Sequence, residues 1–193
     1  MKQFYWIAAA FILLLGAGYG LFVQQQKPKS GASKRIPCQK EAVCFERTYH
    51  IGNLKTVVAL LEARRYTLNS RIKKSEYMPS RLFEHVDKAE VDRMVREAIE
   101  THVPKAEASE EVLGHELTID YMIYENDKLD PGKKTDKSKL YEGYLVFDFK
   151  LDGKTAYKFQ IDFMDKNGAD IPKRVACAIR SLISLDVAGG KSE

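Results

Sequence analysis

The sequence lacks the short motifs that identify the common catalytic centres. It contains no H-E-x-x-H pair typical of zinc proteases and no G-x-S-x-G elbow typical of serine hydrolases. It also has no Walker loop and no G-x-G-x-x-G fingerprint, which argues against a nucleotide site. We therefore expect no catalytic residue, no metal site and no cofactor.

Histidine is scarce as well. Only four are present: His50, His85, His102 and His115. One local polar cluster could be an acid–base or metal site, and it comprises Glu84, His85, Asp87, Glu90 and Asp92. Its spacing matches no known mechanism, so a solvated start of a helix is the better interpretation.

Cysteine is limited to Cys38 and Cys44, close together, and Cys177 far downstream. In an exported chain these residues predict a disulfide. We expect the Cys38–Cys44 pairing, because a short loop closes at low entropic cost. The alternative pairs Cys177 with one of them, but helical spacing predicts an exposed Cys177. A metal site is disfavoured, since the C-x₂-C spacing is missing.

The folded part of the chain has no excess of basic charge. Residues 1–36 hold five of the 31 basic residues and no acidic one, leaving 26 basic against 27 acidic residues. A nearly neutral domain argues against nucleic acid as a partner. We expect instead that Lys27, Lys29, Lys34 and Arg35 lie at a membrane surface and meet lipid head groups, or form a solvated linker.

One long apolar run is present, from Phe4 to Val23. A helix of its length spans about 30 Å, the thickness of a bilayer core. The run predicts a transmembrane signal anchor, with a cleaved signal peptide as the alternative. The positive-inside rule favours a cytoplasmic C-terminus, whereas the charged start and the cysteines favour export. We expect export: a single-pass protein of the bacterial inner membrane with its C-terminal domain in the periplasm.

These features divide the chain into five parts. We expect an N-terminal tail at 1–3, the anchor at 4–23, a basic linker at 24–37, one domain at 38–187 and a tail at 188–193. About 150 residues are enough for one domain with a hydrophobic core.

Hydrophobic periodicity predicts the elements of this domain. Alternation predicts strands over 43–51 and 117–124, and a further strand is an option within 66–80. Helical spacing predicts helices from Asn53 to Tyr66, from Asp87 to Pro104 and from Asp170 to Leu185. The fold class is α+β: a transmembrane helix followed by one small domain, whose mainly antiparallel sheet is packed by about three helices.

The stretch 144–163 predicts a hairpin around Asp152-Gly153. A two-residue turn would set Phe147 against Lys158 and place the two apolar faces on opposite sides of the sheet. Burial fixes register more strongly than turn preference. We therefore expect a three-residue loop with a bulge, and Phe147 paired with Phe159.

A polar loop, 125–142, is long for a compact domain, which is typical of functional loops. It carries five acidic residues and five lysines around a Pro131-Gly132 turn. We expect an interaction loop there, with Lys128, Pro131, Lys133 and Lys134 as contact residues.

From Glu142 to Leu185 the chain reads EGYLVFDFKLDGKTAYKFQIDF…IPKRVACAIRSLISL. This strand, D-G turn, strand and cysteine-containing amphipathic helix resembles the C-terminal domains of TonB- and TolA-type envelope proteins. The resemblance implies an anchored periplasmic interaction domain. The long linker that lets such proteins cross the periplasm is missing here, so it does not imply energy transfer.

The sequence thus predicts a non-catalytic, membrane-anchored subunit of a cell-envelope assembly, such as a secretion, pilus or transport complex. Its partners would be membrane lipid and other envelope proteins, with oligomerisation left open. The alternative is a secreted enzyme or inhibitor, released after signal-peptide cleavage.

Overall fold

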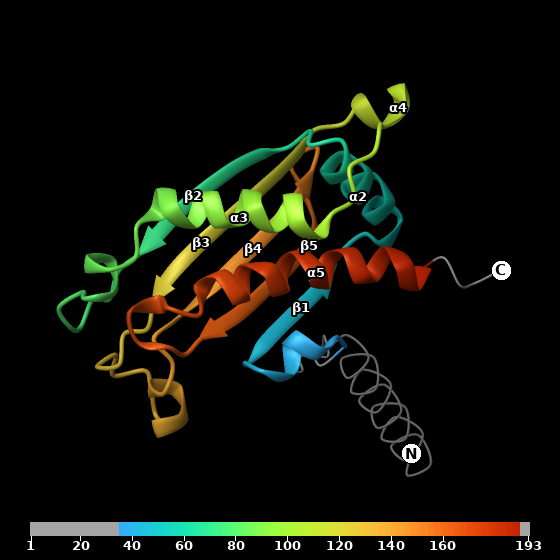
Figure 1. The fold of residues 1–193 in the computed structure, drawn as a ribbon. Coiled ribbons are helices and arrows are strands. Elements are labelled where there is room, and N and C mark those ends of the chain that lie inside the picture. The colour runs from blue at the N-terminus through green and yellow to red at the C-terminus, as the bar shows by residue number, and fades with distance from the viewer. Residues whose placement is uncertain (1–34, 190–193) are drawn as a thin grey trace, which may run out of the picture. The chain divides into compact units, whose positions relative to one another are not determined.

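The computed structural model describes residues 35–189, which form one sheet with helices packed on one of its faces (Figure 1). The strands are β1 (Cys44–Thr48), β2 (Thr67–Lys73), β3 (Leu117–Glu125), β4 (Gly143–Leu151) and β5 (Lys154–Phe163). The helices are α2 (Leu54–Glu62), α3 (Lys88–His102), the single turn α4 (Glu110–Leu113) and α5 (Ile171–Gly189). Five 3-10 turns connect them: η1 (Pro37–Lys40), η2 (Ile51–Asn53), η3 (Leu82–Glu84), η4 (Asp136–Lys139) and η5 (Lys166–Gly168).

The five strands are ordered β1-β5-β4-β3-β2. All neighbours are antiparallel except β2 and β3, which are parallel and are joined by α3 as the crossover. Asp87 begins α3 by accepting a hydrogen bond from the amide of Ala89, as an N-cap does. The mainly antiparallel α+β domain is confirmed, and so is the optional strand within 66–80.

Alternate residues of β3 and β4 are buried, and they share the face that the helices cover. Five aromatic rings form a continuous row across this face, with neighbouring ring centroids 5.3–6.3 Å apart. The row consists of Tyr121, Phe147, Phe149, Tyr157 and Phe159. Such ring contacts add to the free energy gained by burying the rings.

The β4–β5 hairpin has both a two-residue turn and the register that burial requires. Asp152 and Gly153 adopt φ values of 50° and 75°, as a tight hairpin turn needs. A bulge then shifts the register between Phe149 and Lys150, so that Phe147 pairs with Phe159. The predicted pairing is confirmed, but the three-residue loop is wrong. The extra residue lies in the strand, not in the turn.

Strand β1 lies at the edge of the sheet, and its apolar face points away from the helices. Val43, Phe45 and Tyr49 are 49%, 37% and 43% exposed, whereas Cys44 is fully buried. The polar Glu46 shares the covered face with Cys44. The alternating pattern predicted a strand correctly, but alternation alone does not say which face is covered.

The transmembrane part of the fold-class prediction needs correction. Within the described residues no helix is long and apolar enough to cross a membrane. The predicted anchor at 4–23 lies outside the described residues, as do Lys27, Lys29 and Lys34. The prediction of a single-pass inner-membrane protein rested on such a helix and is corrected with it.

Candidate interaction surface

One end of the sheet carries two loops that are joined by a buried carboxylate. Glu125, the last residue of β3, is 6% exposed. Its Oε1 accepts hydrogen bonds from the amides of Arg81 and Leu82 at 2.8 and 2.9 Å, and its Oε2 accepts one from the amide of Ser75 at 3.0 Å. Glu125 therefore fixes the segment 75–82, which links β2 to α3, against the start of the 125–142 loop.

This hydrogen bonding changes the acidity of Glu125. Burial alone would raise its pKa, but the bonds from the Leu82 amide, the Ser80 side chain and the other backbone amides outweigh burial and lower the pKa to about 2. Asp127 also binds backbone amides of segment 75–82: its Oδ2 accepts hydrogen bonds from the amides of Glu76 and Tyr77 at 2.6 and 2.7 Å. The two loops form one preorganised unit.

Within the 125–142 loop most acidic side chains are engaged with other groups of the domain, whereas three of the five lysines face solvent. Besides Glu125 and Asp127, Asp130 accepts from the amide of Gly132, and Glu142 pairs with Lys128 at 2.6 Å. Asp136 alone of the five acids has no such contact within the described residues. Three lysines of the loop are exposed: Lys134, Lys137 and Lys139. A partner touching this loop therefore meets three exposed lysines and one exposed aspartate, Asp136.

Large apolar side chains are exposed on the same two loops. Tyr77, Leu129 and Leu140 are 56%, 66% and 64% exposed, and Met164 after β5 is 40% exposed. Between the loops lies a cleft of about 740 Å³. Its walls include Met78, Leu82, Glu125, Lys128, Met164 and Lys166. We call the cleft and its two loops, 75–82 and 125–142, the loop-end surface.

A tyrosine cluster lies beside this surface, on the uncovered face of the sheet. The rings of Tyr124 and Tyr144 stack at 4.5 Å, and Tyr141 meets Tyr144 edge-on at 6.3 Å. The Lys133 ammonium lies 5.3 Å from the centroid of the Tyr141 ring. This cation–π contact joins two parts of the 125–142 loop, and the Tyr141–Tyr144 contact sets the loop against β4.

Two titratable groups at the tyrosine cluster have shifted pKa values: Asp162, which pairs with Tyr144 across the β4–β5 hairpin, and Lys133. Burial raises the pKa of Asp162 to about 6, although Gln160 and the charges of Arg174 and Lys133 oppose the rise. Burial lowers the pKa of Lys133, against the attraction of nearby carboxylates. An aspartate near pKa 6 is a feature of many functional sites. Sequence reasoning missed Asp162, because in the linear pattern it looks like any solvent-facing residue of an alternating strand.

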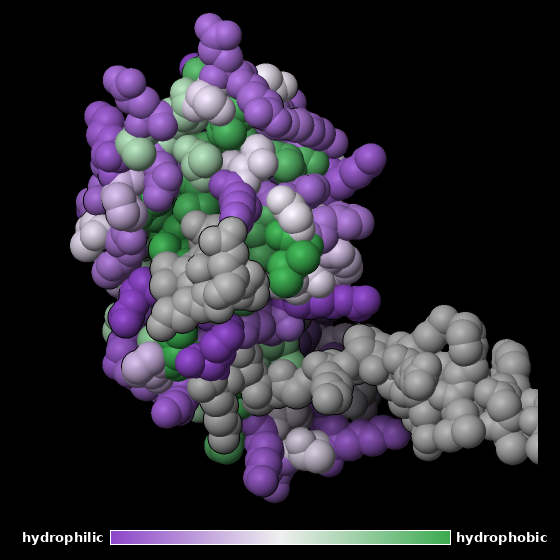
Figure 2. All heavy atoms as spheres, turned by 90° about the vertical axis from the view of Figure 1, so that its right-hand side faces the viewer, coloured by the Kyte–Doolittle hydropathy of each residue, from purple (hydrophilic) through white to green (hydrophobic). Residues whose placement is uncertain are grey.

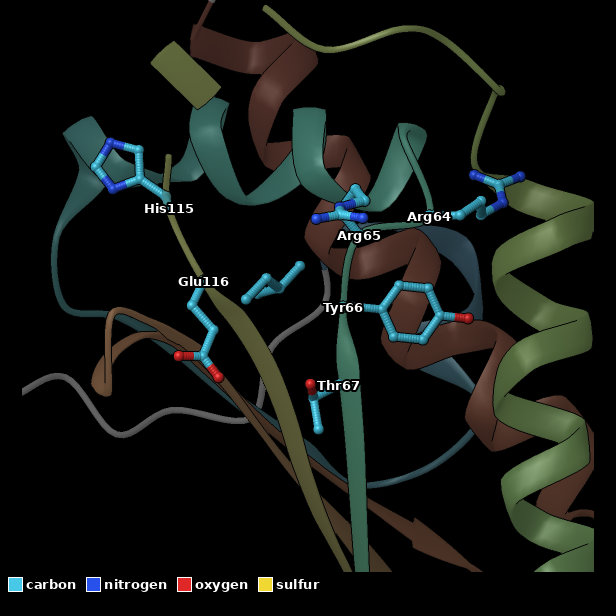
Figure 3. Close-up of a pocket in the computed structure, with 7 residues that line it drawn as sticks. Arg64, Arg65, Tyr66, Thr67, His115 and Glu116 are labelled. Carbon is cyan, nitrogen blue, oxygen red and sulfur yellow. The ribbon is translucent and has the colours of Figure 1, made fainter. Parts of the chain in front are cut away.

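The opposite end of the sheet is different. Figure 2 faces that end and shows apolar side chains separated by hydrophilic ones. A pocket of about 370 Å³ lies where β2 and β3 begin (Figure 3). His115 and Arg64 lie on its two sides, each bound to a carboxylate: His115 to Asp152 at 2.8 Å and Arg64 to Glu100 at 2.7 Å. The pocket shows no nucleophile aligned with a base.

No family model matches this chain, and no curated protein matches it. Five solved chains match its structure, and two of them are dodecamers of PelC from Paraburkholderia phytofirmans. One, a single-residue variant, is 7% identical with a TM-score of 0.33, and the other is 10% identical with a TM-score of 0.31. Each match covers 74% of this chain and 96% of the PelC chain. Similarity at this level assigns neither a family nor a function, and the resemblance to TonB- and TolA-type domains stays a prediction.

The predicted contact residues of the 125–142 loop take different positions. Lys128 lines the cleft and pairs with Glu142, and Lys133 packs on Tyr141. Pro131 and Lys134 are exposed. Among residues 35–189 no group of three or more metal-ligating side chains converges. Sequence reasoning missed the role of segment 75–82, because its attachment depends on two carboxylates, Glu125 and Asp127, that lie more than 40 residues further along the chain.

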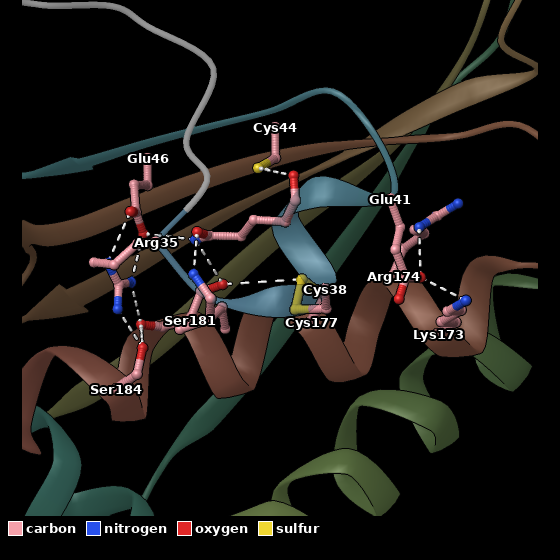
Figure 4. The surroundings of a disulfide bond; sticks show 12 residues. Arg35, Cys38, Glu41, Cys44, Glu46, Lys173, Arg174, Cys177, Ser181 and Ser184 are labelled. Atoms are coloured by element: carbon pink, nitrogen blue, oxygen red, sulfur yellow. Dashed lines mark hydrogen bonds and ion pairs between the residues drawn. A yellow bond between two sulfur atoms is a disulfide. The ribbon is translucent and has the colours of Figure 1, made fainter.

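The predicted Cys38–Cys44 disulfide is wrong. Cys38 is bonded to Cys177, with the Cα atoms 5.8 Å apart (Figure 4). Cys44 is a buried thiol, and its Sγ lies 3.7 Å from the carbonyl of Gln39. The predicted stripe of α5 is buried, so its helical phase is correct; Cys177 is nevertheless 1% exposed, because the N-terminal segment 35–41 covers the face of α5 that we expected to be solvated.

Arg35, predicted to lie at a membrane surface, is engaged within this segment. Its guanidinium binds both carboxylate oxygens of Glu46, at 3.0 and 2.7 Å, and the carbonyl of Ser181 at 2.7 Å. Gln39 donates to the Ser181 hydroxyl at 3.1 Å. Glu46 also accepts from the Tyr157 hydroxyl. The network joins segment 35–41 to α5, β1 and β5.

Proposed function

We propose that the domain is a non-catalytic protein-interaction module that binds an acidic, partly apolar segment of a partner protein at the loop-end surface. The observation that carries this proposal is the preorganised pair of loops. Three large apolar side chains, Tyr77, Leu129 and Leu140, are more than half exposed on segments that carboxylates hold in place. A surface that is ordered before binding loses little conformational entropy when a partner docks.

Charge distribution selects the class of partner. Four of the five acids of the 125–142 loop are engaged in hydrogen bonds or an ion pair, while Lys134, Lys137 and Lys139 face solvent. Complementary acidic residues on a partner would speed association and select against basic partners. The apolar side chains would supply the buried centre of such an interface.

The experiment is site-specific photocrosslinking in the native host with the full-length chain. A benzophenone amino acid at Leu140 is expected to give a discrete protein adduct. The same group at Glu97, an exposed position on α3, is the control and is expected to give none. Replacing the three exposed lysines by glutamate should remove the Leu140 adduct, and replacing them by arginine should preserve it.

The proposal is overturned if Leu140 and Glu97 give the same adducts, or if the adduct survives charge reversal. An adduct with nucleic acid or lipid in place of protein also overturns it, because the lysines would then serve a different kind of anion.

A further inference from the structure

The end of the domain opposite the loop-end surface carries a short acidic segment, residues 107–116. Its sequence, EASEEVLGHE, is the one ten-residue stretch of the chain with four acidic residues and no lysine or arginine. The segment contains α4, which begins at Ser109, whose hydroxyl accepts a hydrogen bond from the amide of Val112. Val112 packs against the core, whereas Leu113 is 43% exposed. The acidic segment therefore presents a capped turn with an exposed leucine.

The carboxylates of the acidic segment face solvent. Glu107, Glu110 and Glu111 are exposed, and none of them forms an ion pair with another residue of 35–189. The acids on α3 differ in this respect, since Glu97 pairs with Arg93 one turn away. Uncompensated charges of one sign repel acidic surfaces and attract basic ones. The acidic segment is therefore electrostatically complementary to the exposed lysines of the 125–142 loop.

The acidic segment and the loop-end surface lie at opposite ends of one strand. The segment precedes β3 and the 125–142 loop follows it, and Figure 1 shows α4 and this loop beyond opposite ends of the sheet. A strand of nine residues, the length of β3, spans about 30 Å. The two complementary surfaces are therefore too far apart to meet within one chain, and a contact between them has to join two copies.

We propose that the acidic segment of one copy docks on the loop-end surface of the next, with its carboxylates against the exposed lysines and Leu113 in the cleft. This inference rests on the proposed function and names its partner, a second copy of this chain. That function calls for an acidic, partly apolar segment, and residues 107–116 have both properties. The walls of the cleft include Met78, Leu82 and Met164, and methionine side chains adapt readily to an apolar group.

Such a contact is heterologous, because it joins two different surfaces of the same chain. After one contact has formed, each pair of copies retains one unused acidic segment and one unused loop-end surface. Association therefore continues until a ring closes or a filament forms. Because exposed charges drive the approach, the association should weaken as ionic strength rises.

Sedimentation velocity of the full-length chain tests the contact by charge reversal on each side. The unchanged protein is expected to show a reversible, salt-sensitive self-association. Glu110→Lys/Glu111→Lys makes the acidic segment basic, and Lys137→Glu/Lys139→Glu makes the loop acidic. Each variant alone should associate at least about tenfold more weakly, because like charges would then face each other.

A mixture of the two variants provides the decisive measurement. The reversed loop of one variant matches the reversed segment of the other, and the two unchanged surfaces also match. The mixture should therefore regain the association that each variant lacks alone. Glu90→Lys/Glu97→Lys is the matched control, since it reverses two exposed glutamates on α3, and it should associate as the unchanged chain does. Circular dichroism of each variant confirms that the fold is retained.

Four results overturn the inference: a monomer at the highest soluble concentration, association that withstands either reversal, a mixture that does not regain it, or equal loss in the α3 control. Photocrosslinking at Leu140 separates this inference from the proposed function. An adduct between two copies of this chain supports both. A charge-dependent adduct with a different protein leaves the proposed function standing and overturns the docking of a second copy.

Discussion

The hydroxyl of Tyr157 donates a 2.6 Å hydrogen bond to the carboxylate of Glu46, beneath the N-terminal segment 35–41. Tyr157 is fully buried in β5, and Glu46 lies on the covered face of β1. The same carboxylate binds the guanidinium of Arg35. This pair therefore links β1, segment 35–41 and β5 in one place. Removing it tests how much these contacts contribute to the stability of the domain.

Tyr157→Phe is expected to destabilise the domain by about 1.5–3 kcal/mol, the usual contribution of a hydrogen bond to a charged group. Urea unfolding measures the change in free energy. Tyr144→Phe is the matched control, because its hydroxyl has no hydrogen bond with the described residues, and it should change stability by less than about 0.5 kcal/mol. Equal effects of the two variants would contradict the role of the Tyr157–Glu46 bond.

Reducing the Cys38–Cys177 bond should lower stability strongly. The two residues are 139 positions apart, and the loop-entropy relation gives about 5 kcal/mol for a loop of that size. Thermal unfolding of Cys38→Ala/Cys177→Ala against Cys44→Ala measures this, and the double variant should have the lower Tm. Non-reducing peptide mapping should yield a crosslinked peptide containing Cys177. Recovery of a Cys38–Cys44 peptide would contradict the pairing.

Glu125 should make the domain acid-labile. Its pKa in the folded state, about 2, is below the ordinary value of 4.5, so the unfolded chain binds a proton first as pH falls. The stability that Glu125 contributes is complete above pH 4.5 and is lost between about 4.5 and 2. Glu125→Gln should lower the free energy of unfolding by about 3 kcal/mol at pH 7. It should also remove the fall of that free energy between pH 4.5 and 2. Denaturant unfolding across that range gives the slope, and an unchanged slope would contradict the assignment.

Asp162 should give the opposite dependence. Its pKa in the folded state, about 6, lies above the ordinary 3.8, so the folded domain retains a proton that the unfolded chain releases. Stability should therefore fall as pH rises from about 4 to 6. Asp162→Asn should remove this slope and stabilise the domain by about 1–3 kcal/mol at pH 7. Destabilisation at pH 7 would show that the carboxylate is needed in its ionised form.

Local patterning was enough to predict most elements, because each depends on side chains close in sequence. The hairpin register followed from burial, and Phe147 does pair with Phe159. Local patterning does not say which other element of the fold packs on a given face of a helix or strand. Cys177 was assigned to the wrong environment for this reason, because segment 35–41 covers it. The alternation of β1 likewise did not say which of its faces is covered, and no described element covers the apolar one.

The proposed contact surface was predictable only in part. The length of the 125–142 loop singled it out, but its acidic and basic residues look balanced in sequence. The balance is lost in three dimensions, because Glu125 accepts three amide hydrogen bonds from a segment that precedes α3. Such pairings have no periodicity and no fixed spacing, so nothing in the linear pattern distinguishes an engaged carboxylate from a solvated one.

The Cys38–Cys177 bond also determines how the domain responds to mechanical force. A pull applied between the residues before Cys38 and those after Cys177 passes through the disulfide directly from η1 into α5. The 139-position loop that contains all five strands bears none of that load. At roughly 3.6 Å per residue, about 500 Å of chain stays unavailable for extension until the bond is reduced. In an oxidising environment the domain therefore behaves under tension as a short, nearly inextensible connector.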